Sequence, residues 1–249
     1  MDPIFISVDL RTGIKFSYSP VSDLGPDRIA DSVAAHNNYQ KGKYKIVVDF
    51  GTATVFEVIS DKGEFLGGSI FPGLEIASKA LSLKASLLNE IDFDKWDDSQ
   101  KVIGNTTNEA LKSSIYWGYI SLTDGIVKKI IDELIAHGAA NIADQLDAKL
   151  IVAFTESGST AARVAAYRPS QPVVAISPDS NAAINLGLRW GVNTINVESF
   201  DHIEDMFTFS ENFVLQEKLA SIGDTIVVVA GLPIGFKGNT NLIRVITIN

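Results

Sequence analysis

The amino-acid sequence predicts an α/β protein of two modules, residues 1–137 and 138–249. In the first module, strand-like segments follow one another through short turns, which is typical of a meander sheet. In the second, strand-like segments alternate with single helices, which indicates a mostly parallel sheet with helices on both faces. A chain of 249 residues is long enough for two domains of ordinary size.

The first module is expected to begin with short extended segments and to continue with a helix, a meander and further helices. Asp27 stands where the first helical pattern starts, and the helix dipole stabilises a carboxylate at that end. His137 and Gly138 are expected to interrupt the last helical pattern. The expected strands are 4–8, 13–18, 45–49, 54–59 and 65–71, and the expected helices start at Asp27 and cover 74–88, 110–119 and 124–135.

The second module is expected to form a three-layer α/β/α sheet. Its last strand follows a Gly-rich loop instead of a helix, so that strand should run antiparallel to its neighbour. The expected strands are 150–154, 172–176, 194–197, 225–230 and 241–248, and the expected helices are 139–146, 161–167, 181–190 and 205–220.

Charge and composition narrow the classes of partner. The net charge of −9 argues against nucleic acid and anionic membranes, because binding to them needs a dense Lys and Arg surface. The absence of cysteine excludes disulfides, thiolate metal ligands and cysteine nucleophiles. The start lacks the basic and apolar regions of a signal peptide, and the longest apolar runs are too short to cross a bilayer. We therefore expect a cytoplasmic protein whose partners are small phosphorylated molecules.

Three motifs in the first half carry a family resemblance. They are Gly25-Pro26-Asp27-Arg28, Asp49-Phe50-Gly51-Thr52-Ala53-Thr54 and Gly67-Gly68-Ser69-Ile70-Phe71-Pro72-Gly73. In this order they resemble type III pantothenate kinase, a member of the actin-like ATPase superfamily, over about residues 3–135. The resemblance implies a partial actin-like (ribonuclease H-like) lobe.

The resemblance implies a role for each of these residues in phosphoryl transfer. Asp27 matches the catalytic base that orients or deprotonates the acceptor hydroxyl, and Asp49 matches a cation-binding carboxylate. A Gly-Thr-Ala-Thr turn lets backbone amides and hydroxyls approach phosphate closely. The substrate-side residues would be Thr12, Gly13, Tyr18, Gly25 and Arg28, and the nucleotide or phosphate side would be Gly51, Thr52, Thr54, Gly68, Pro72 and Gly73.

The chain also departs from the family pattern. The family's opening strand with Asp-x-Gly-Asn-Thr has no counterpart here, and neither does its later Gly-Gly loop. Actin-like kinases close two lobes around ATP, and positioning by both lobes supplies most of the catalysis. We therefore expect one wall of the cleft to be missing and the exposed face to favour a homo-oligomer.

The second half carries a different resemblance, over about residues 139–249. Thr155-Glu156-Ser157-Gly158-Ser159-Thr160, with Tyr167-Arg168-Pro169 and Trp190-Gly191-Val192, resembles the pyruvate kinase C-terminal domain. The resemblance does not include the catalytic barrel, so pyruvate kinase activity is not expected. In some members a loop of this kind binds an effector phosphate, here through Thr155, Ser157, Gly158, Ser159 and Thr160. The alternative is a capped helix start that needs no ligand.

Three functions follow from these patterns. The leading hypothesis is a chimeric or recombined α/β protein that lacks the complete catalytic site of either parent and retains weak phosphate or nucleotide binding. The first alternative is an ATP-dependent pantothenate kinase with Asp27 as base, which would use Mg²⁺ and a monovalent cation; no cofactor is expected otherwise. The second alternative is a sugar-phosphate sensor that uses the loop 155–160.

Overall fold

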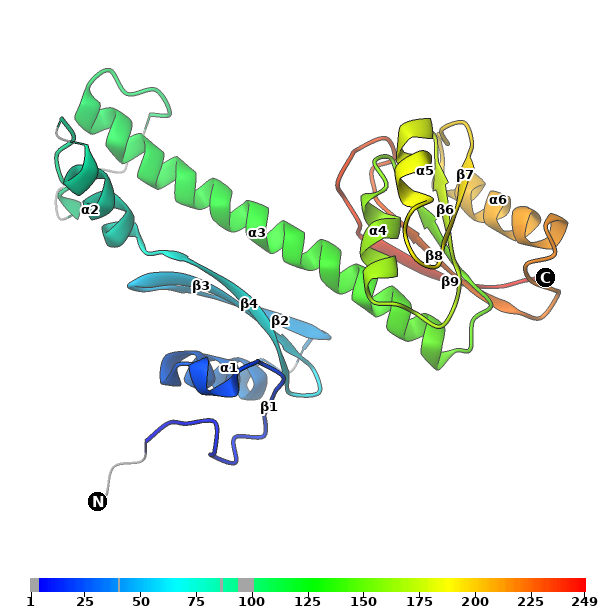
Figure 1. The fold of residues 1–249 in the computed structure, drawn as a ribbon, viewed down its shortest axis with the longest axis horizontal. Helices are drawn as coiled ribbons and strands as arrows, with labels where there is room; N and C mark the ends of the chain where they lie inside the picture. The colour runs from blue at the N-terminus through cyan, green and yellow to red at the C-terminus, as the bar shows by residue number, and fades with distance from the viewer. Residues whose placement is uncertain (1–4, 40, 86, 94–100) are drawn as a thin grey trace. The chain divides into compact units, whose positions relative to one another are not determined.

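The computed structural model describes residues 5–39, 41–85, 87–93 and 101–249. It contains two compact units, Met1–Val127 (unit 1) and Lys128–Asn249 (unit 2). The module boundary expected between residues 137 and 138 falls inside helix α3 (Thr107–Gln145), which contributes its first part to unit 1 and its second part to unit 2 (Figure 1). No helix in the described ranges is both long and apolar enough to span a membrane.

Unit 1 is built on a four-stranded sheet that contains the expected meander. Residues 5–8 are not a strand, because this segment turns locally and the Leu10 N–H donates to the Ser7 carbonyl at 3.2 Å. The strand expected at 13–18 is shorter than predicted, because β1 comprises only Lys15 and Phe16. The order is β1-β4-β3-β2, with β1 Lys15–Phe16, β2 Tyr44–Phe50, β3 Ala53–Ser60 and β4 Glu64–Pro72.

Helices cover both faces of this sheet. Helix α1 (Pro26–Asn38) lies on one face, where Ile29 and Phe65 are buried in a common apolar cluster (Figure 1). Helix α2 (Leu74–Lys84) packs with the first part of α3 in a second cluster around Leu111 and Ile115. A short 3-10 helix, Val21–Asp23, leads into α1. The first of these clusters fixes the position of α1 against the sheet, because it also contains Val47 of β2 and Ile59 of β3.

Helix α3 corrects the expectation of three separate helices. It runs without a break through His137 and Gly138. A glycine costs a helix only about 1 kcal/mol, and burial of the neighbouring Ala136 and Ala139 offsets that cost. A Cβ on Gly138 would lie 3.5 Å from the Ile243 Cδ1 atom, so the glycine lies on the side of the helix that packs against the unit 2 sheet.

Unit 2 confirms the predicted three-layer α/β/α sheet. The strand order is β7-β6-β5-β8-β9, and only β9 is antiparallel to its neighbour. The strands are β5 Ile151–Phe154, β6 Val173–Ser177, β7 Val192–Asn196, β8 Thr225–Ala230 and β9 Leu242–Thr247.

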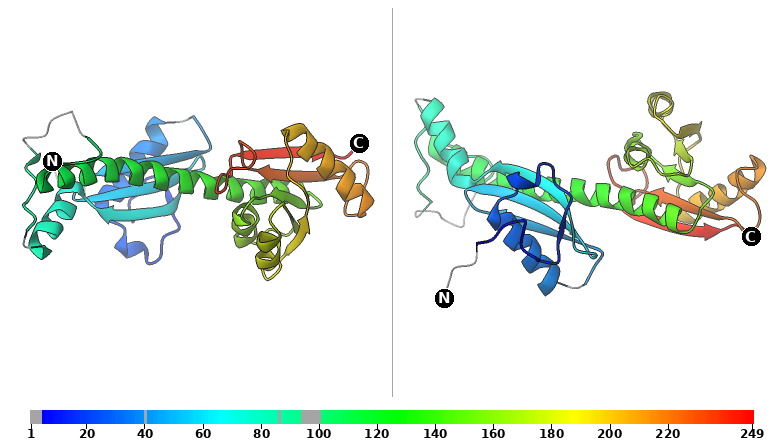
Figure 2. Two further views of the ribbon diagram at one scale, coloured as in Figure 1. Left: turned by 90° about the horizontal axis from the view of Figure 1, so that it is seen from above. Right: turned by 60° about the horizontal axis from the view of Figure 1, so that its bottom comes forward.

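The helices of unit 2 are divided between the two faces of its sheet. The second part of α3, α4 (Ser159–Ala166) and α5 (Ser180–Leu186) share one apolar cluster. Helix α6 (Ile203–Gln216) packs on the other face (Figure 2). The expected helix 181–190 is wrong at its end, because α5 stops at Leu186 and Gly187 is its C-cap.

Candidate functional site

The start of α1 presents an exposed carboxylate in unit 1. Gly25 is the N-cap, Pro26 occupies the first turn, and Asp27 follows with its side chain exposed. Proline fits this position because the first helical N–H groups lack partners in any case. The Asp27 Oδ1 atom folds back so close to Gly25 that any Cβ there would collide with it. The glycine at position 25 therefore leaves room for the carboxylate in this position.

Next to Asp27, a buried ion pair joins α1 to β3. The Arg28 Nε atom lies 2.7 Å from the Glu57 Oε1 atom, and the two residues are 8% and 1% exposed. The Ser32 hydroxyl donates to the second oxygen of Glu57 at 3.4 Å and to the Arg28 carbonyl at 2.8 Å. The guanidinium also lies over the rings of Tyr18 and Phe65, at 5.1 and 5.4 Å from their centroids. Arg28 is thus held rigidly in the core of unit 1.

The ionisation of Arg28 follows from these neighbours. Burial by itself lowers the pKa of Arg28, but a hydrogen bond with Tyr18 and the Glu57 carboxylate outweigh it, so the net pKa is raised. The resemblance places Arg28 among the substrate-side residues. In the structure its Nε atom is bonded to Glu57 and the guanidinium also has a hydrogen bond with Tyr18, so only the N–H groups left over from these two bonds are available for a further partner.

Three aspartates gather where α1 crosses β2. Asp31 lies one helical turn after Asp27, and Asp49 is near the end of β2. Burial raises the pKa of Asp31 first, and the negative charges of Asp49 and Asp27 raise it further. The sequence motifs identified Asp27 and Asp49 but not Asp31. In the structure, the negative charges of Asp27 and Asp49 both act on the carboxyl group of Asp31.

The resemblance implies that Asp49 holds a cation. Among the described residues, no group of three or more His, Cys, Asp or Glu side chains is close enough to hold a metal ion. Asp49 alone is a poor donor set for Mg²⁺, which needs octahedral oxygen coordination. No chemical step in unit 1 is therefore assigned to a bound metal.

The turn between β2 and β3 contains the Gly-Thr-Ala-Thr motif. Gly51 and Thr52 are exposed, whereas Thr54 is fully buried and its Oγ1 atom has no hydrogen-bond partner. Gly73 packs against this turn, because its N–H donates to the Thr52 carbonyl at 2.9 Å. The structure thus places Gly51 and Thr52 where a phosphate could reach them, and it places Thr54 in the core.

The remaining predicted residues of unit 1 have local structural roles. Gly68 lies directly opposite Glu57 in the β3–β4 ladder, and a Cβ there would collide with the Phe56 carbonyl. Pro72 accepts a hydrogen bond from the Tyr119 hydroxyl through its carbonyl, at 2.7 Å. Thr12 and Gly13 form a tight turn just before β1. The Thr12 hydroxyl accepts a hydrogen bond from the Ile14 N–H, and Gly13 has a φ of 82°.

In unit 2, the loop predicted to bind phosphate lines a pocket. Gly158 has a φ of 83° and caps α4, so Ser159 and Thr160 occupy its first turn. The pocket is closed on its other side by the loop before β9. It is lined by Phe154, Thr155, Glu156, Ser159, Thr160, Met206, Gly231, Ile234, Gly235, Phe236, Gly238 and Asn239. Of the predicted effector residues, Thr155, Ser159 and Thr160 line it, and Ser157 and Gly158 do not.

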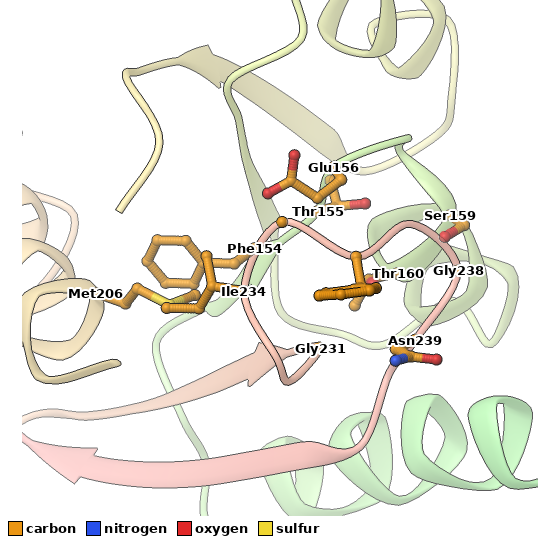
Figure 3. A pocket seen from close by; sticks show the side chains of 12 residues that line it. Phe154, Thr155, Glu156, Ser159, Thr160, Met206, Gly231, Ile234, Gly238 and Asn239 are labelled. Carbon is orange, nitrogen blue, oxygen red and sulfur yellow. The ribbon is translucent and has the colours of Figure 1, made fainter. Parts of the chain in front are cut away.

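The pocket is apolar on one side and polar on the other. Phe154, Met206 and Ile234 lie together, and Ser159 and Asn239 lie opposite them (Figure 3). The hydroxyl of Thr155 and the side-chain oxygen of Asn239 are buried without a hydrogen-bond partner. No Lys or Arg lines this pocket, whereas the carboxylate of Glu156 does. Neutral hydrogen-bonding groups therefore dominate its polar side.

A buried network anchors the pocket to α3. The Thr240 N–H donates to the Asp132 Oδ1 atom at 2.9 Å, and the Thr240 hydroxyl lies 3.0 Å from that of Thr160. The Arg163 guanidinium bridges Thr240 and Asp132. Its Nη1 atom lies 3.3 Å from the Thr240 hydroxyl, and its Nη2 atom lies 3.4 Å from the Asp132 Oδ2 atom. Together these bonds hold the loop before β9 in place.

Sequence motifs missed Glu57, Asp31 and Asp132. The available signal for Glu57 was a carboxylate inside an otherwise apolar strand, which needs a buried cation as partner. For Asp31, the signal was its spacing of four residues from Asp27 on a helix.

Comparison with known proteins agrees with both halves of the structure. Unit 1 is an actin-like lobe, and the model of the family described as "Type III pantothenate kinase" matches residues 1–129. The chain belongs to this family. The model described as "Pyruvate kinase, alpha/beta domain" matches residues 133–246, so the two families occur in tandem.

Two curated relatives match the first half of the chain. The type III pantothenate kinase of Koribacter versatilis is 41% identical over 134 residues, which is 54% of this chain and 47% of the relative. The enzyme of Persephonella marina is 40% identical over 131 residues, 53% of this chain and 49% of the relative. The chain thus spans about half the length of the curated relatives it matches. Among solved structures, Cryptosporidium parvum pyruvate kinase in complex with ADP matches 48% of this chain and 24% of its own, with 31% identity and a TM-score of 0.44.

Proposed function

We propose that unit 1 is the acceptor-side lobe of a pantothenate kinase, which binds pantothenate and presents Asp27 to its hydroxyl. The observation that carries the proposal is the exposed Asp27 carboxylate beside the immobile, buried Arg28. A general base must lie within hydrogen-bond reach of the proton it takes, and a rigid neighbour keeps it there.

The proposed step is transfer of a phosphoryl group from ATP. Asp27 accepts the hydroxyl proton, the hydroxyl oxygen attacks the γ-phosphorus, and the bond to ADP breaks. The exposed Gly51–Thr52 turn offers the hydroxyl of Thr52 to the phosphates, whereas the Gly51 N–H already donates to the Ala53 carbonyl at 3.0 Å. The names of the relatives of unit 1 support pantothenate as acceptor.

Binding and turnover test this proposal separately. Calorimetry with pantothenate should show binding to the parent chain and to Asp27→Asn. A coupled assay for ADP should show turnover that depends on pantothenate and falls by roughly a hundredfold or more in Asp27→Asn. Asp23→Asn, an exposed carboxylate just before α1, is the matched control and should leave both unchanged.

The outcomes separate the alternatives. Binding without turnover would favour a recombined chain that retains only the acceptor side. Turnover that Asp27→Asn does not reduce would contradict Asp27 as base, and absence of both binding and turnover would remove the kinase proposal.

A phosphate sensor in unit 2 is a second candidate. The sensor is favoured by the Thr155 hydroxyl, which is buried without a hydrogen-bond partner beside the start of α4. The negative charge of Glu156 in the same pocket would repel a highly charged anion. Calorimetry with fructose 1,6-bisphosphate tests it. Heat that is lost in Ser159→Ala and kept in Ser157→Ala, whose side chain does not line the pocket, would support the sensor; no heat from the parent chain would remove it.

A further inference from the structure

The pocket at the start of α4 in unit 2 contains a carboxylate without a cation beside it. Glu156 lines the pocket, whereas no Lys or Arg does. Arg163 lies on the same helix, but Asp132 and the Thr240 hydroxyl already hold its guanidinium at 3.4 and 3.3 Å. Glu156 itself forms no ion pair in the ranges that the structure describes. A ligand with several negative charges would therefore be repelled by a charge that no side chain of the pocket offsets.

Helix α4 offers a place for a single negative group. Its N-cap is Gly158, which has no side chain to cap the helix, and the Ala162 N–H is the first to bond within it, to the Gly158 carbonyl at 3.0 Å. The N–H groups of the residues between them have no acceptor within the helix. The aligned peptide dipoles add about half a positive elementary charge at this end. One carboxylate is enough to balance that charge.

Two buried atoms of the pocket accept hydrogen bonds but receive none from the described residues. Thr155 is 7% exposed, and its hydroxyl has no partner. The Asn239 Oδ1 atom is also buried without a partner, while the Nδ2 atom of the same amide donates to the Leu232 carbonyl at 3.5 Å. Buried polar atoms without partners cost free energy. A ligand that donates hydrogen bonds removes this cost, whereas a fully ionised phosphate has only acceptors.

The opposite side of the pocket is apolar. Phe154, Met206 and Ile234 lie together there, across from Ser159 and Asn239 (Figure 3). The pocket has an empty volume of about 340 Å³, which includes space open to solvent, so its ligand must be small. A small ligand that matches both sides has one apolar part and one polar part.

An ammonium group, a carboxylate and an apolar side chain are the three parts of an apolar α-amino acid. We propose that the pocket binds a small amino acid of this kind as a zwitterion. Its carboxylate lies at the start of α4, its ammonium group donates to Glu156 and Thr155, and its side chain lies against the apolar side. Both charged groups are attached to one carbon atom, and the single loop from Thr155 to Ser159 supplies partners to both. This ligand replaces the sugar phosphate of the second candidate function.

Calorimetry with L-valine and three analogues tests the proposal without mutation. L-Valine should bind to the full chain. Isobutylamine lacks the carboxylate, 3-methylbutanoate lacks the amine and glycine lacks the side chain, so each should bind at least roughly tenfold more weakly than valine. Absence of heat with valine, or equal affinities for valine and 3-methylbutanoate, would overturn the proposal.

One substitution tests the partner of the ammonium group. Glu156→Gln keeps the size of the side chain and removes its charge, so it should raise the dissociation constant of valine by roughly tenfold or more. It should not weaken the binding of 3-methylbutanoate, which has no ammonium group. Glu217→Gln removes an exposed carboxylate at the end of α6, outside the pocket, and as the matched control should leave both affinities unchanged. Circular dichroism checks that both variants are folded. Valine binding that is equally tight in Glu156→Gln and in the parent chain would contradict the zwitterion site.

Fructose 1,6-bisphosphate separates this proposal from the sugar-phosphate sensor. Heat from the bisphosphate together with none from valine would favour the sensor and overturn the amino-acid site, and absence of heat from both would remove both. Nuclear magnetic resonance locates the ligand, because valine should shift the amide signals of Ser159 and Thr160. Shifts confined to unit 1 would overturn the proposal. These experiments contain no pantothenate, so their results are independent of the proposed kinase function.

Discussion

Glu57 illustrates how a single buried charge organises unit 1. It is enclosed by β3 and α1, and its short bond to Arg28 satisfies a charge that would otherwise be costly to bury. The pair connects the helix that carries Asp27 to the centre of the sheet. Sequence motifs alone identified Arg28 but not its partner, because contact between residues 29 positions apart depends on how α1 packs on the sheet.

Loss of the Glu57 charge should weaken unit 1 strongly. Glu57→Gln leaves the Arg28 guanidinium buried without a carboxylate, which typically costs about 3 kcal/mol or more. Hydrogen exchange of the β3 amides measures this as a lower free energy of opening. Lys15→Gln is the control, because the exposed Lys15–Glu64 pair at 3.5 Å should contribute less than about 1 kcal/mol. Equal effects of the two substitutions would contradict a structural role for the buried pair.

Asp31 should make the stability of unit 1 depend on pH. Its raised pKa means that the folded state binds the proton more tightly than the unfolded chain does. The charged form therefore destabilises the fold, and the cost grows as pH rises through the pKa of Asp31. Asp31→Asn should be more stable than the parent chain at pH 7, and this gain should vanish near about pH 3, where the carboxyl is protonated. Urea unfolding of both proteins at pH 7 and at low pH measures the difference in their free energies of unfolding. A difference that is unchanged at low pH would show that the charge of Asp31 is not its cause.

The secondary-structure elements show where sequence patterns are sufficient. The meander of unit 1 and the alternating strands and helices of unit 2 were predicted correctly, because burial enforces clear apolar periodicity. Helix α3 was predicted in pieces, because His137 and Gly138 resemble a helix end when tertiary packing is ignored. Of the strand expected at 4–8, residue 4 lies outside the described residues and residues 5–8 are not a strand, because the segment turns locally after Ser7.

Two glycines should respond in opposite directions to alanine. At Gly73 a Cβ would collide with the Gly51 and Thr52 carbonyls, so Gly73→Ala should destabilise unit 1 by about 1–3 kcal/mol. At Gly118, inside α3, a Cβ would meet no atom within 4 Å, so Gly118→Ala should stabilise the helix by up to about 1 kcal/mol. Urea unfolding of both variants tests the pair. Destabilisation by Gly118→Ala would show that its surroundings are more crowded than the structure indicates.

At the scale of the whole molecule, two units with separate cores share one chain and one helix. Each unit has one candidate site at the start of a helix: Asp27 at the start of α1 in unit 1, and the loop between β5 and α4 in unit 2. Sequence motifs located both regions, because glycines and small polar residues concentrate there. They did not reveal the order of the strands, because strand order becomes visible only in the folded sheet.

Pantothenate binding to isotope-labelled protein tests the central claim most directly. In nuclear magnetic resonance spectra of the full chain, pantothenate should shift the amide signals of Tyr18 and of Gly25, Asp27 and Arg28, and leave the signals of unit 2 unchanged. Spectra that do not change at millimolar pantothenate, or changes confined to unit 2, would contradict the account of unit 1 as an acceptor-binding lobe.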